Sequence, residues 1–370
     1  MTGLPQPGDE FGGYKIEKLL GQGGCAAVFQ AEQTRTNRKV AIKIVLPHII
    51  EAVAGVAPRF LREIDVVKRI EHPNVIRLFD FGQTDSGLLW MAMELVSGKD
   101  LQEVLRAEGR FEPERALHVM TQALSGLAVA HDTQIVHRDL KPSNLMLTDQ
   151  GVNRDIVKVL DFGIGKAIGA DEDKTVQEVT EAFGDALGSP HYMAPELLKR
   201  EAVGTASDVY SMGLILFEML TGRPAVEADT IFEVYAKQVY NDIAMPKWLA
   251  HSALGPILNK ATAKTTADRY GSAKEFLAAL QKVDAGSITY VENDEVLTPE
   301  PKMPARKSRA GVPTAEKPAP APAPVPAKKP PAPRRKKTRK KKAQSQQTAL
   351  LLLLLAASFI LLAIYFLTNT

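Results

Sequence analysis

The sequence of 370 residues contains a single cysteine, Cys25, and only two tryptophans. One thiol cannot form a disulfide within the chain, so a cross-linked secreted fold is excluded and a reducing compartment is expected. The first fifteen residues, MTGLPQPGDEFGGYK, have neither a basic nor an apolar stretch, so no secretory signal is expected there. The content of 45% hydrophobic and 24% charged residues is nevertheless typical of a folded protein.

Acidic residues are nearly absent from the C-terminal part of the chain. From Lys302 onward there are 15 Lys or Arg residues and one acid, Glu316, whereas residues 1–301 hold 31 basic and 42 acidic residues. An acidic body argues against nucleic acid as a partner, and a basic tail favours an anionic surface.

The tail divides by composition into a linker and an apolar end. Residues 284–348 are expected to form a disordered linker, because residues 312–333 contain nine Pro and six Ala, which favours extended polyproline II structure without a packed core. Eight of the nine residues 334–342 are basic. This basic run is interpreted either as a contact with anionic lipids or as a simple stop-transfer flank, whereas a nuclear address conflicts with the apolar end of the chain.

Residues 349–367 carry no charge. As a helix, nineteen residues span about 28 Å, close to the ~30 Å hydrocarbon thickness of a bilayer. The sequence therefore predicts one transmembrane helix at 349–367 in the cell membrane. The positive-inside rule then places the basic run and the body in the cytoplasm, with only residues 368–370 outside.

Residues 14–283 mix short β-rich runs with longer helical patterns, which indicates an α+β domain. Near its start, Gly21, Gly23 and Gly24 lie between two expected strands, and such glycines let backbone N–H groups approach phosphates. The same pattern is also typical of an ordinary hairpin.

An alternating strand follows at residues 39–45 and carries Lys43, which can hold a phosphate. Its candidate acidic partner is Glu63, in a helical pattern over residues 58–70 that puts Phe60, Ile64 and Val67 on one face. The alternative is a solvated surface bridge of little energetic value.

Residues 135–147, IVHRDLKPSNLML, have a polar turn flanked by apolar residues, which predicts a loop between two short buried strands. Asp139 suits a proton acceptor for a hydroxyl nucleophile, and Lys141 can neutralise a transferred phosphoryl group. Asn144 and Asp161 supply the oxygen ligands that a metal ion on phosphates prefers.

The order of glycine loop, VAIK, HRDLKPSN, DFG and MAPE resembles the eukaryotic-type (Hanks-type) serine/threonine protein kinase family over about residues 14–283. A short kinase domain followed by one predicted C-terminal membrane span resembles the bacterial membrane-tethered members of this family. The resemblance implies a bilobal protein kinase fold with a small β-rich N-lobe and a larger helical C-lobe. It also implies ATP with Mg²⁺, or Mn²⁺, as cofactors and proteins as substrates.

The resemblance also implies a role for each matched residue. Asp139, Lys141 and Asn144 would be catalytic, with Asp139 as the base, and Asn144 and Asp161 would hold the metal. The expected nucleotide-binding residues are Leu20, Gly21, Gln22, Gly23, Gly24, Cys25, Ala26, Ala27, Val28, Ala41, Lys43, Glu63, Met93, Glu94 and Val96.

Further matched positions imply structural roles. Met93 would guard the adenine pocket and residues 94–96 would form the hinge, while residues 72–74 resemble a turn between a helix and a strand. Asp208 resembles the buried acid that supports the catalytic loop. Arg269 resembles the arginine that pairs with Glu196.

The resemblance favours serine and threonine as acceptors, because residues 188–196 resemble serine/threonine kinases and tyrosine kinases usually lack the lysine at position 141. It favours protein substrates, because small-molecule kinases generally lack the Ala-Pro-Glu segment at 194–196 and the helix after it. Thr175 and Thr180 are predicted sites of autophosphorylation, which would order the loop through Arg138 and would be promoted by self-association in the membrane plane.

Two features leave alternatives open. Ala26 replaces the third glycine of the loop, which is expected to tune nucleotide affinity. Cys25 is either an oxidisable thiol or a tolerated small residue. The alternative functions are a membrane-anchored pseudokinase scaffold, or an adaptor in which the linker and the basic run do the binding.

Overall fold

The structure, a computed structural model, describes residues 3–52, 55–162, 190–292 and 294–297. The chain divides into two units, residues 1–306 and 307–370, and all the described residues belong to the first. Most of the predicted linker, the basic run and the predicted membrane span lie outside the described residues. Among the residues that are described, no helix is long and apolar enough to cross a bilayer.

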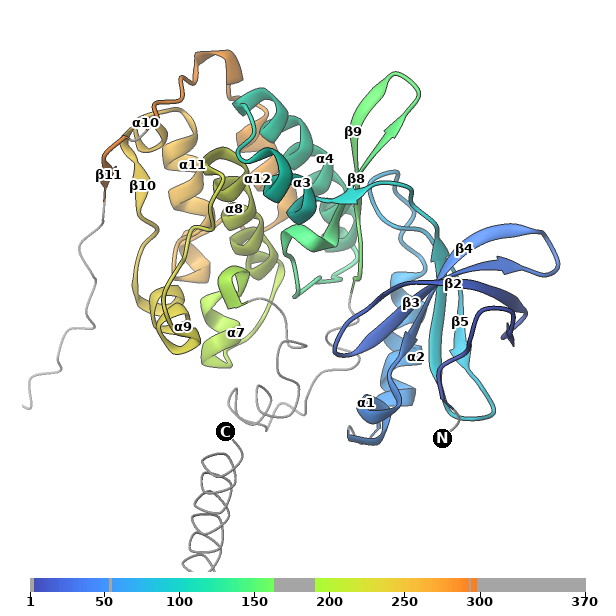
Figure 1. Ribbon diagram of the computed structural model, residues 1–370. Coiled ribbons are helices and arrows are strands. Elements are labelled where there is room, and N and C mark those ends of the chain that lie inside the picture. Colours follow the sequence, from blue (N-terminus) through green and yellow to red (C-terminus); the bar gives the residue numbers. More distant parts are fainter. Residues whose placement is uncertain (1–2, 53–54, 163–189, 293, 298–370) are drawn as a thin grey trace, which may run out of the picture. The chain divides into compact units, whose positions relative to one another are not determined.

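An antiparallel sheet of six strands, in the order β1-β2-β3-β4-β6-β5, forms the N-terminal lobe (Figure 1). Its strands are Glu10–Phe11 (β1), Tyr14–Gln22 (β2), Ala26–Gln33 (β3), Arg38–Val45 (β4), Leu78–Gln83 (β5) and Leu89–Glu94 (β6). The predicted strand at 39–45 is confirmed as β4, where Val40, Ile42 and Ile44 are buried while Lys43 is only half-buried. Since β4 pairs with both β3 and β6, Lys43 lies on an inner strand of the sheet.

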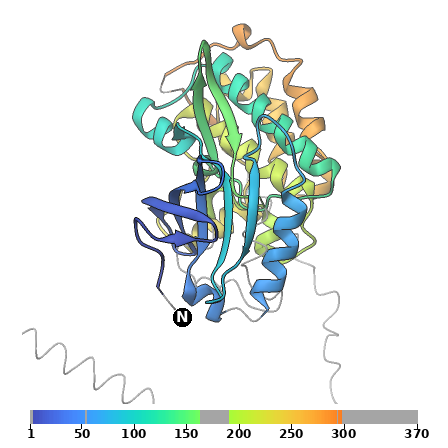
Figure 2. The same ribbon diagram turned by 90° about the vertical axis from the view of Figure 1, so that its right-hand side faces the viewer.

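Two helices follow β4, namely α1 (Pro47–Ala52) and α2 (Val56–Val67), and α2 packs beside the sheet against β5 (Figure 2). The predicted face of Phe60, Ile64 and Val67 is buried as expected. The helix nevertheless ends three residues earlier than predicted. The chain leaves it through a tight turn, in which the N–H groups of Arg69 and Ile70 donate to the carbonyls of Val66 and Val67, three residues back.

The second lobe is helical and is built around α8, a helix that is apolar on all sides and almost wholly buried, as expected for a central helix. Helices α4, α11 and α12 pack against it (Figure 1). It starts three residues before the predicted Asp208 and ends, as predicted, at Gly222, whose φ of 74° suits glycine. The helices of this lobe are α3 (Leu101–Glu108), α4 (Pro113–Asp132), α7 (Pro195–Lys199), α8 (Thr205–Thr221), α9 (Ile231–Tyr240), α10 (Lys247–Ala250), α11 (Leu254–Ala261) and α12 (Ala273–Leu280).

Two small antiparallel sheets and several short turns complete the described chain. The first sheet orders β7 (Lys99–Asp100), β8 (Leu145–Gln150) and β9 (Asn153–Val159), and the second pairs β10 (Met245–Pro246) with β11 (Val296–Leu297). The single-turn 3₁₀ helices are η1 (Pro142–Asn144), η3 (Pro190–Tyr192), η4 (Thr266–Asp268) and η5 (Ala285–Ser287). The prediction of a β-rich lobe followed by a helical lobe is therefore confirmed.

The turn at residues 72–74 joins α2 to the strand region, as predicted, and also ties the lobes together. Asn74 donates from Nδ2 to the carbonyl of Val157 on β9 at 2.9 Å, and its own carbonyl accepts from the N–H of Val159 at 2.8 Å. This contact places the end of β9, and hence Asp161 two residues later, beside the N-terminal lobe.

Candidate active site

The loop between α4 and β8 carries Asp139, Lys141 and Asn144. The prediction of a strand before this loop is wrong, because residues 135–141 form no strand and follow directly on the end of α4. Their backbone is held instead by a side chain. The N–H groups of His137 and Arg138 donate to the carboxylate oxygens of Asp208 on α8 at 2.7 and 2.9 Å.

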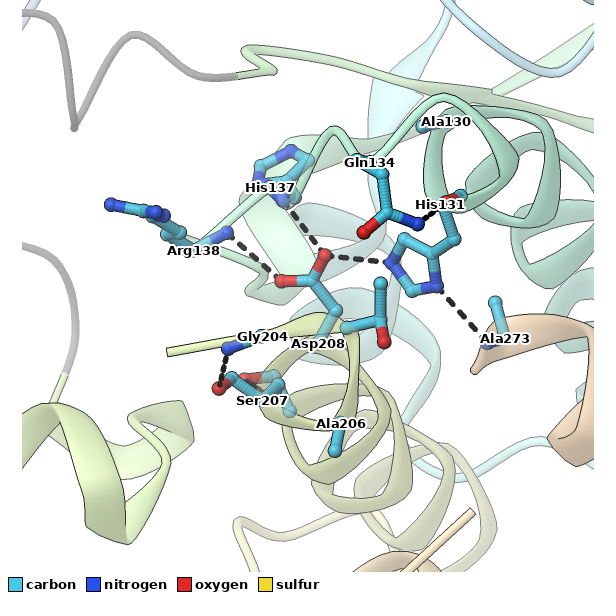
Figure 3. Close-up of polar contacts among 12 residues, drawn as sticks. Ala130, His131, Gln134, His137, Arg138, Gly204, Ala206, Ser207, Asp208 and Ala273 are labelled. Carbon is cyan, nitrogen blue, oxygen red and sulfur yellow. Dashed lines mark hydrogen bonds and ion pairs between the residues drawn. The ribbon is translucent and has the colours of Figure 1, made fainter. Parts of the chain in front are cut away.

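Asp208 is almost completely buried, with 1% of its surface exposed, and it accepts a third hydrogen bond from Nε2 of His131 at 3.0 Å (Figure 3). The other ring nitrogen of His131, Nδ1, accepts from the N–H of Ala273, the first residue of α12, at 3.1 Å. Nδ1 therefore has no proton, and the ring carries its proton on Nε2. The predicted role of Asp208 is confirmed, whereas no pattern in the sequence indicated the part played by His131.

The carboxylate of Asp139 is fixed from two sides but stays accessible. Lys141 Nζ lies 3.0 Å from Oδ2 of Asp139, and Nδ2 of Asn144 donates to the backbone carbonyl of Asp139 at 2.6 Å and to its Oδ2 at 3.4 Å. About a third of the Asp139 side chain, 35%, is exposed. A carboxylate that is oriented and solvent-accessible suits proton transfer to or from a bound hydroxyl.

Asp161 follows β9 and turns toward the N-terminal lobe, where its Oδ2 lies 2.7 Å from Nζ of Lys43. The residues around it fix this direction. His137 bonds to the carbonyl of Leu160 through Nε2 at 2.6 Å, and its ring packs against buried Phe162 with 4.8 Å between ring centroids. Burial alone would raise the pKa of Asp161, but the Lys43 ammonium, by its charge and its hydrogen bond, brings that pKa below its usual value.

The backbone of Arg138 and Asp161 lies in the left-handed region, with φ of 70° and 61°. Non-glycine residues there cost of the order of 1–3 kcal/mol each and persist where the surrounding structure holds them. Arg138 directly precedes Asp139 and Asp161 contacts Lys43, so two of the six non-glycine residues with positive φ in the described chain lie at the candidate site.

Lys43 pairs across the sheet with Val28 on β3 and Met91 on β6, and Glu63 lies half-buried on α2. Glu63 is the partner of Lys43 expected from the sequence, and the structure shows an ion pair of Lys43 with Asp161. The residues named for the metal and for the phosphates are therefore in direct contact.

The predicted glycine hairpin is formed by β2 and β3. A Cβ added at Gly21 or Gly23 would meet no atom within 4 Å, and neither residue has a positive φ. Neither crowding nor backbone conformation within the described chain requires glycine at these two positions. Close approach of a ligand to the backbone is a physical reason for glycine at both positions.

The other residues named for this hairpin differ in exposure. Leu20, Gln22 and Gly24 are exposed, whereas Ala26 is buried and Ala27 is fully buried in the core. Cys25 is half-buried, and burial raises the pKa of its thiol. A raised pKa disfavours the reactive thiolate, which supports the interpretation of Cys25 as a tolerated small residue.

The residues named for the adenine pocket lie on adjoining strands. Ala41 on β4 pairs with Met93 on β6, both are buried, and Val96 is half-buried just beyond. The side chain of Glu94 forms an ion pair with Lys158 of β9 at 2.8 Å. The end of β6 is thereby joined to the strand that leads to Asp161.

The predicted pair of Glu196 and Arg269 is confirmed as a bidentate one, with distances of 2.7 and 2.8 Å. Ser207 adds a hydrogen bond to Glu196 at 2.6 Å. Because the two charged side chains are almost completely buried, this pair has a structural role.

Among the described residues, no group of three or more His, Cys, Asp or Glu could hold a metal ion. A magnesium ion in a phosphotransferase needs no such cage, since one or two protein oxygens and the substrate phosphates complete its ligands. The Asp161 carboxylate and the side-chain oxygen of Asn144 fit that donor set.

A β-rich lobe that bears a glycine hairpin and a lysine, joined to a helical lobe that bears Asp139, Asn144 and Asp161, defines a protein kinase domain. A family model described as the protein kinase domain matches residues 14–287, so the chain belongs to the protein kinase family, as the sequence predicted.

Relatives and solved structures agree with this family. The chain is 34% identical over 311 residues to the serine/threonine-protein kinase pkn3 of Myxococcus xanthus, covering 81% of this chain and 56% of that protein. It is 33% identical over 295 residues to the serine/threonine-protein kinase PrkC of Bacillus subtilis, covering 78% and 44%. The kinase domain of Mycobacterium tuberculosis PknI matches with a TM-score of 0.59 and 27% identity, over 75% of this chain and 98% of that one. The chain spans about half the length of the curated relatives it matches.

Proposed function

We propose that the chain is an ATP-dependent kinase that phosphorylates serine and threonine hydroxyls of proteins. The observation that carries this function is the oriented and accessible carboxylate of Asp139, held by Lys141 and Asn144. The names of the relatives, which are serine/threonine-protein kinases, support the choice of acceptor.

In the proposed reaction, Asp139 accepts the proton of the attacking hydroxyl. The hydroxyl oxygen forms a bond to the γ-phosphorus while the bond between that phosphorus and the β,γ-bridging oxygen breaks, and ADP leaves with the electron pair. Lys141, 3.0 Å from Asp139, offsets negative charge on the transferred group.

Lys43 and the backbone of the glycine hairpin would hold the phosphates, and Asn144 and Asp161 would hold the metal. A bound Mg²⁺ or Mn²⁺ supplies charge neutralisation on the phosphates. Glu63 on α2 would be the acidic partner of Lys43 when the phosphates are bound. The remaining nucleotide-binding residues named from the sequence are proposed to line the adenine and ribose pockets.

The experiment that tests the function compares the full chain with Asp139→Asn in transfer of labelled phosphate from ATP to casein. Loss of the base is expected to lower the rate about 10²–10⁴-fold. Asp85→Asn, the same change on an exposed loop, serves as the control and should label as well as the unchanged chain. Equal labelling by Asp139→Asn would favour the pseudokinase scaffold.

We further propose autophosphorylation at Thr175 or Thr180, both outside the described residues. The support lies in Arg138, whose Nε is buried and finds no hydrogen-bond partner within the described part of the chain. A phosphate offers acceptor oxygens for such a donor. Mass spectrometry after treatment with ATP would detect the modified residue, and an unmodified pair of threonines would refute the proposal.

We also propose that residues 349–367 anchor the chain in the cell membrane, with the kinase domain in the cytoplasm and the basic run at 334–342 on anionic lipid. The support is the uncharged stretch beside a basic flank. Leu354→Arg is expected to release the full chain from membranes at alkaline pH, whereas Ala332→Arg, the same added charge in the linker, should not.

Self-association in the membrane predicts faster autophosphorylation of the anchored chain than of the Leu354→Arg variant.

A further inference from the structure

Helix α9 contains one completely buried polar side chain, Gln238, with 0% of its surface exposed. A buried amide without hydrogen bonds is costly, so its partners matter. Its Nε2 donates to the carbonyl oxygens of His191 at 2.6 Å and Pro190 at 3.2 Å. Its Oε1 accepts from the hydroxyl of Tyr210 on α8, and that hydroxyl accepts from Nζ of Lys264 at 2.7 Å.

The direction of each bond in this chain follows from chemistry. Carbonyl oxygens only accept, so the nitrogen of the Gln238 amide must face Pro190 and His191. The amide oxygen then faces Tyr210, whose hydroxyl must donate to it. The lone pairs of that hydroxyl are left to accept from Lys264. Reversal of the amide would set oxygen against two carbonyl oxygens, so the order from Lys264 to the His191 carbonyl is fixed.

The two carbonyls belong to the segment that leads into Ala194, Pro195 and Glu196. The rest of this segment is held by α8 and by Arg269, since Tyr192 donates to Glu218, Ser211 donates to the carbonyl of Tyr192 at 2.7 Å, and Glu196 binds Arg269. From α9, the side chain of Gln238 forms hydrogen bonds to this segment. It therefore fixes the start of the segment, whereas α8 and Arg269 fix its end.

We propose that Gln238 is a positioning residue for the protein substrate, and that Tyr210 and Lys264 hold its amide in the required orientation. This inference rests on the proposed kinase function, because the segment at residues 188–196 is the one whose sequence favours a protein acceptor. Gln238 does not touch the reacting atoms. It sets the backbone of Pro190 and His191, on which the polypeptide around the acceptor hydroxyl would lie.

The test measures KM for casein, KM for ATP and kcat for the full chain and for Gln238→Met, a change that keeps the volume of the side chain and removes both amide functions. Loss of the two hydrogen bonds is expected to raise KM for casein about ten-fold with KM for ATP unchanged. Tyr210→Phe should shift the same constant in the same direction by less, because the amide keeps its donors.

Gln122 provides a matched control on α4. Its Nε2 also donates to a backbone carbonyl, that of Asp155 at 2.8 Å, and its Oε1 also accepts, from Asn74 at 3.1 Å, but it joins α4 to β9 away from the segment. Gln122→Met is expected to lower the stability of the fold without raising KM for casein relative to KM for ATP. Hydrogen–deuterium exchange at residues 190–194 should rise in Gln238→Met and not in Gln122→Met.

The outcomes separate the two proposals. An unchanged chain that transfers no phosphate to casein overturns the kinase function, and the substrate role of Gln238 falls with it. An active chain in which Gln238→Met and Gln122→Met give the same KM for casein overturns the inference alone. Should Gln238→Met raise KM for ATP and KM for casein equally, its role is structural and the inference is also wrong.

Discussion

Two ion pairs of the molecule each join a basic and an acidic residue that are far apart in the sequence, but the two pairs differ in their surroundings. Arg269 and Glu196 lie in the helical lobe with side chains 0% and 2% exposed. Lys43 and Asp161 join the two lobes with side chains 14% and 26% exposed. The first pair is bidentate and closed, whereas the second is a single contact open to solvent.

This difference shows which pair is free to change partners. A buried pair that loses one member leaves a charge in a medium of low dielectric constant, so it is expected to stay as it is. A pair held by a single contact, with part of each side chain exposed, can exchange its partner for a ligand more easily than a closed pair can. The comparison therefore assigns stability to Arg269 and Glu196, and ligand binding to Lys43 and Asp161.

The largest effect is expected from Arg269→Met. Glu196 would keep the hydrogen bond from Ser207 but lose its counter-charge, and removal of one member of a buried pair typically costs about 3–5 kcal/mol of unfolding free energy. Urea denaturation of the full chain followed by circular dichroism measures this loss.

A double variant sharpens the same comparison. Because a buried pair can be replaced by apolar residues of similar volume with little loss, Glu196→Leu combined with Arg269→Met should recover most of the stability lost in the single variant. A single variant as stable as the unchanged chain would remove the distinction between the two pairs.

Lys43→Met tests the open pair. The variant is expected to lower kcat/KM about 10²–10³-fold, because a charge that stabilises the transferred phosphates is lost. Its unfolding free energy should fall by less than that of Arg269→Met, because the pair is a single contact with part of each side chain exposed.

The control is Lys39→Met, which removes a lysine of the same strand from its surface ion pairs with Glu17 and Glu32 and should leave both quantities unchanged. A loss of stability in Lys43→Met as large as that of Arg269→Met would contradict the assignment.

Residues that carry chemistry at fixed offsets could be found from the sequence. Asp139, Lys141 and Asn144 lie within six residues, and Asp161 begins the tripeptide DFG 17 residues after Asn144. Both groups can therefore be recognised from short stretches of sequence. The strand with Lys43 was equally clear, because alternating apolar residues predict a strand without knowledge of its partners.

The residues that position this site could not be found in the same way. His131 meets Ala273 at a separation of 142 residues and Gln238 meets His191 at 47 residues, so neither contact leaves a local pattern. Each is one of several polar residues in its helix, and a periodicity argument does not show that this one is buried. The strand predicted before Asp139 is wrong for a related reason: the local apolar residues are typical of a strand, and they do not show that the backbone there bonds to the Asp208 carboxylate instead of to a neighbouring strand.

A smaller effect is expected from His131→Leu. The variant removes the donor to Asp208 and the acceptor for the N–H of Ala273, so two buried partners lose one hydrogen bond each. An unsatisfied buried group costs about 1–3 kcal/mol, and a loss near 2 kcal/mol is expected in urea denaturation. His118→Leu, a change on the exposed face of the same helix, should have little effect. Equal stability of the two variants would show that Asp208 holds the loop without His131.

The smallest effect is expected in the pH dependence of the unfolding free energy, and it concerns Lys264. Burial lowers the pKa of Lys264 to about 7, with Arg269 and Lys199 adding to the shift and Asp242 opposing it. Above pH 7 the unfolded chain therefore binds more protons at Lys264 than the folded one, and stability rises with pH. Between pH 7.5 and 8.5 the rise should approach about 1 kcal/mol, from a limit near 1.4 kcal/mol per pH unit. The Cys25 thiol, whose pKa burial raises, opposes part of this rise, so the effect of Lys264 is taken from the difference between variants at the same pH values.

Lys264→Met should flatten that rise, as measured by urea denaturation at the two pH values, while Lys260→Met on neighbouring α11 should keep it. A variant Lys264→Met with the same pH dependence as the unchanged chain would show that the lysine stays charged in the folded state throughout. Lys264 would then resemble Arg269, which keeps its charge in the folded protein, and the comparison of the two pairs would extend to a third cation.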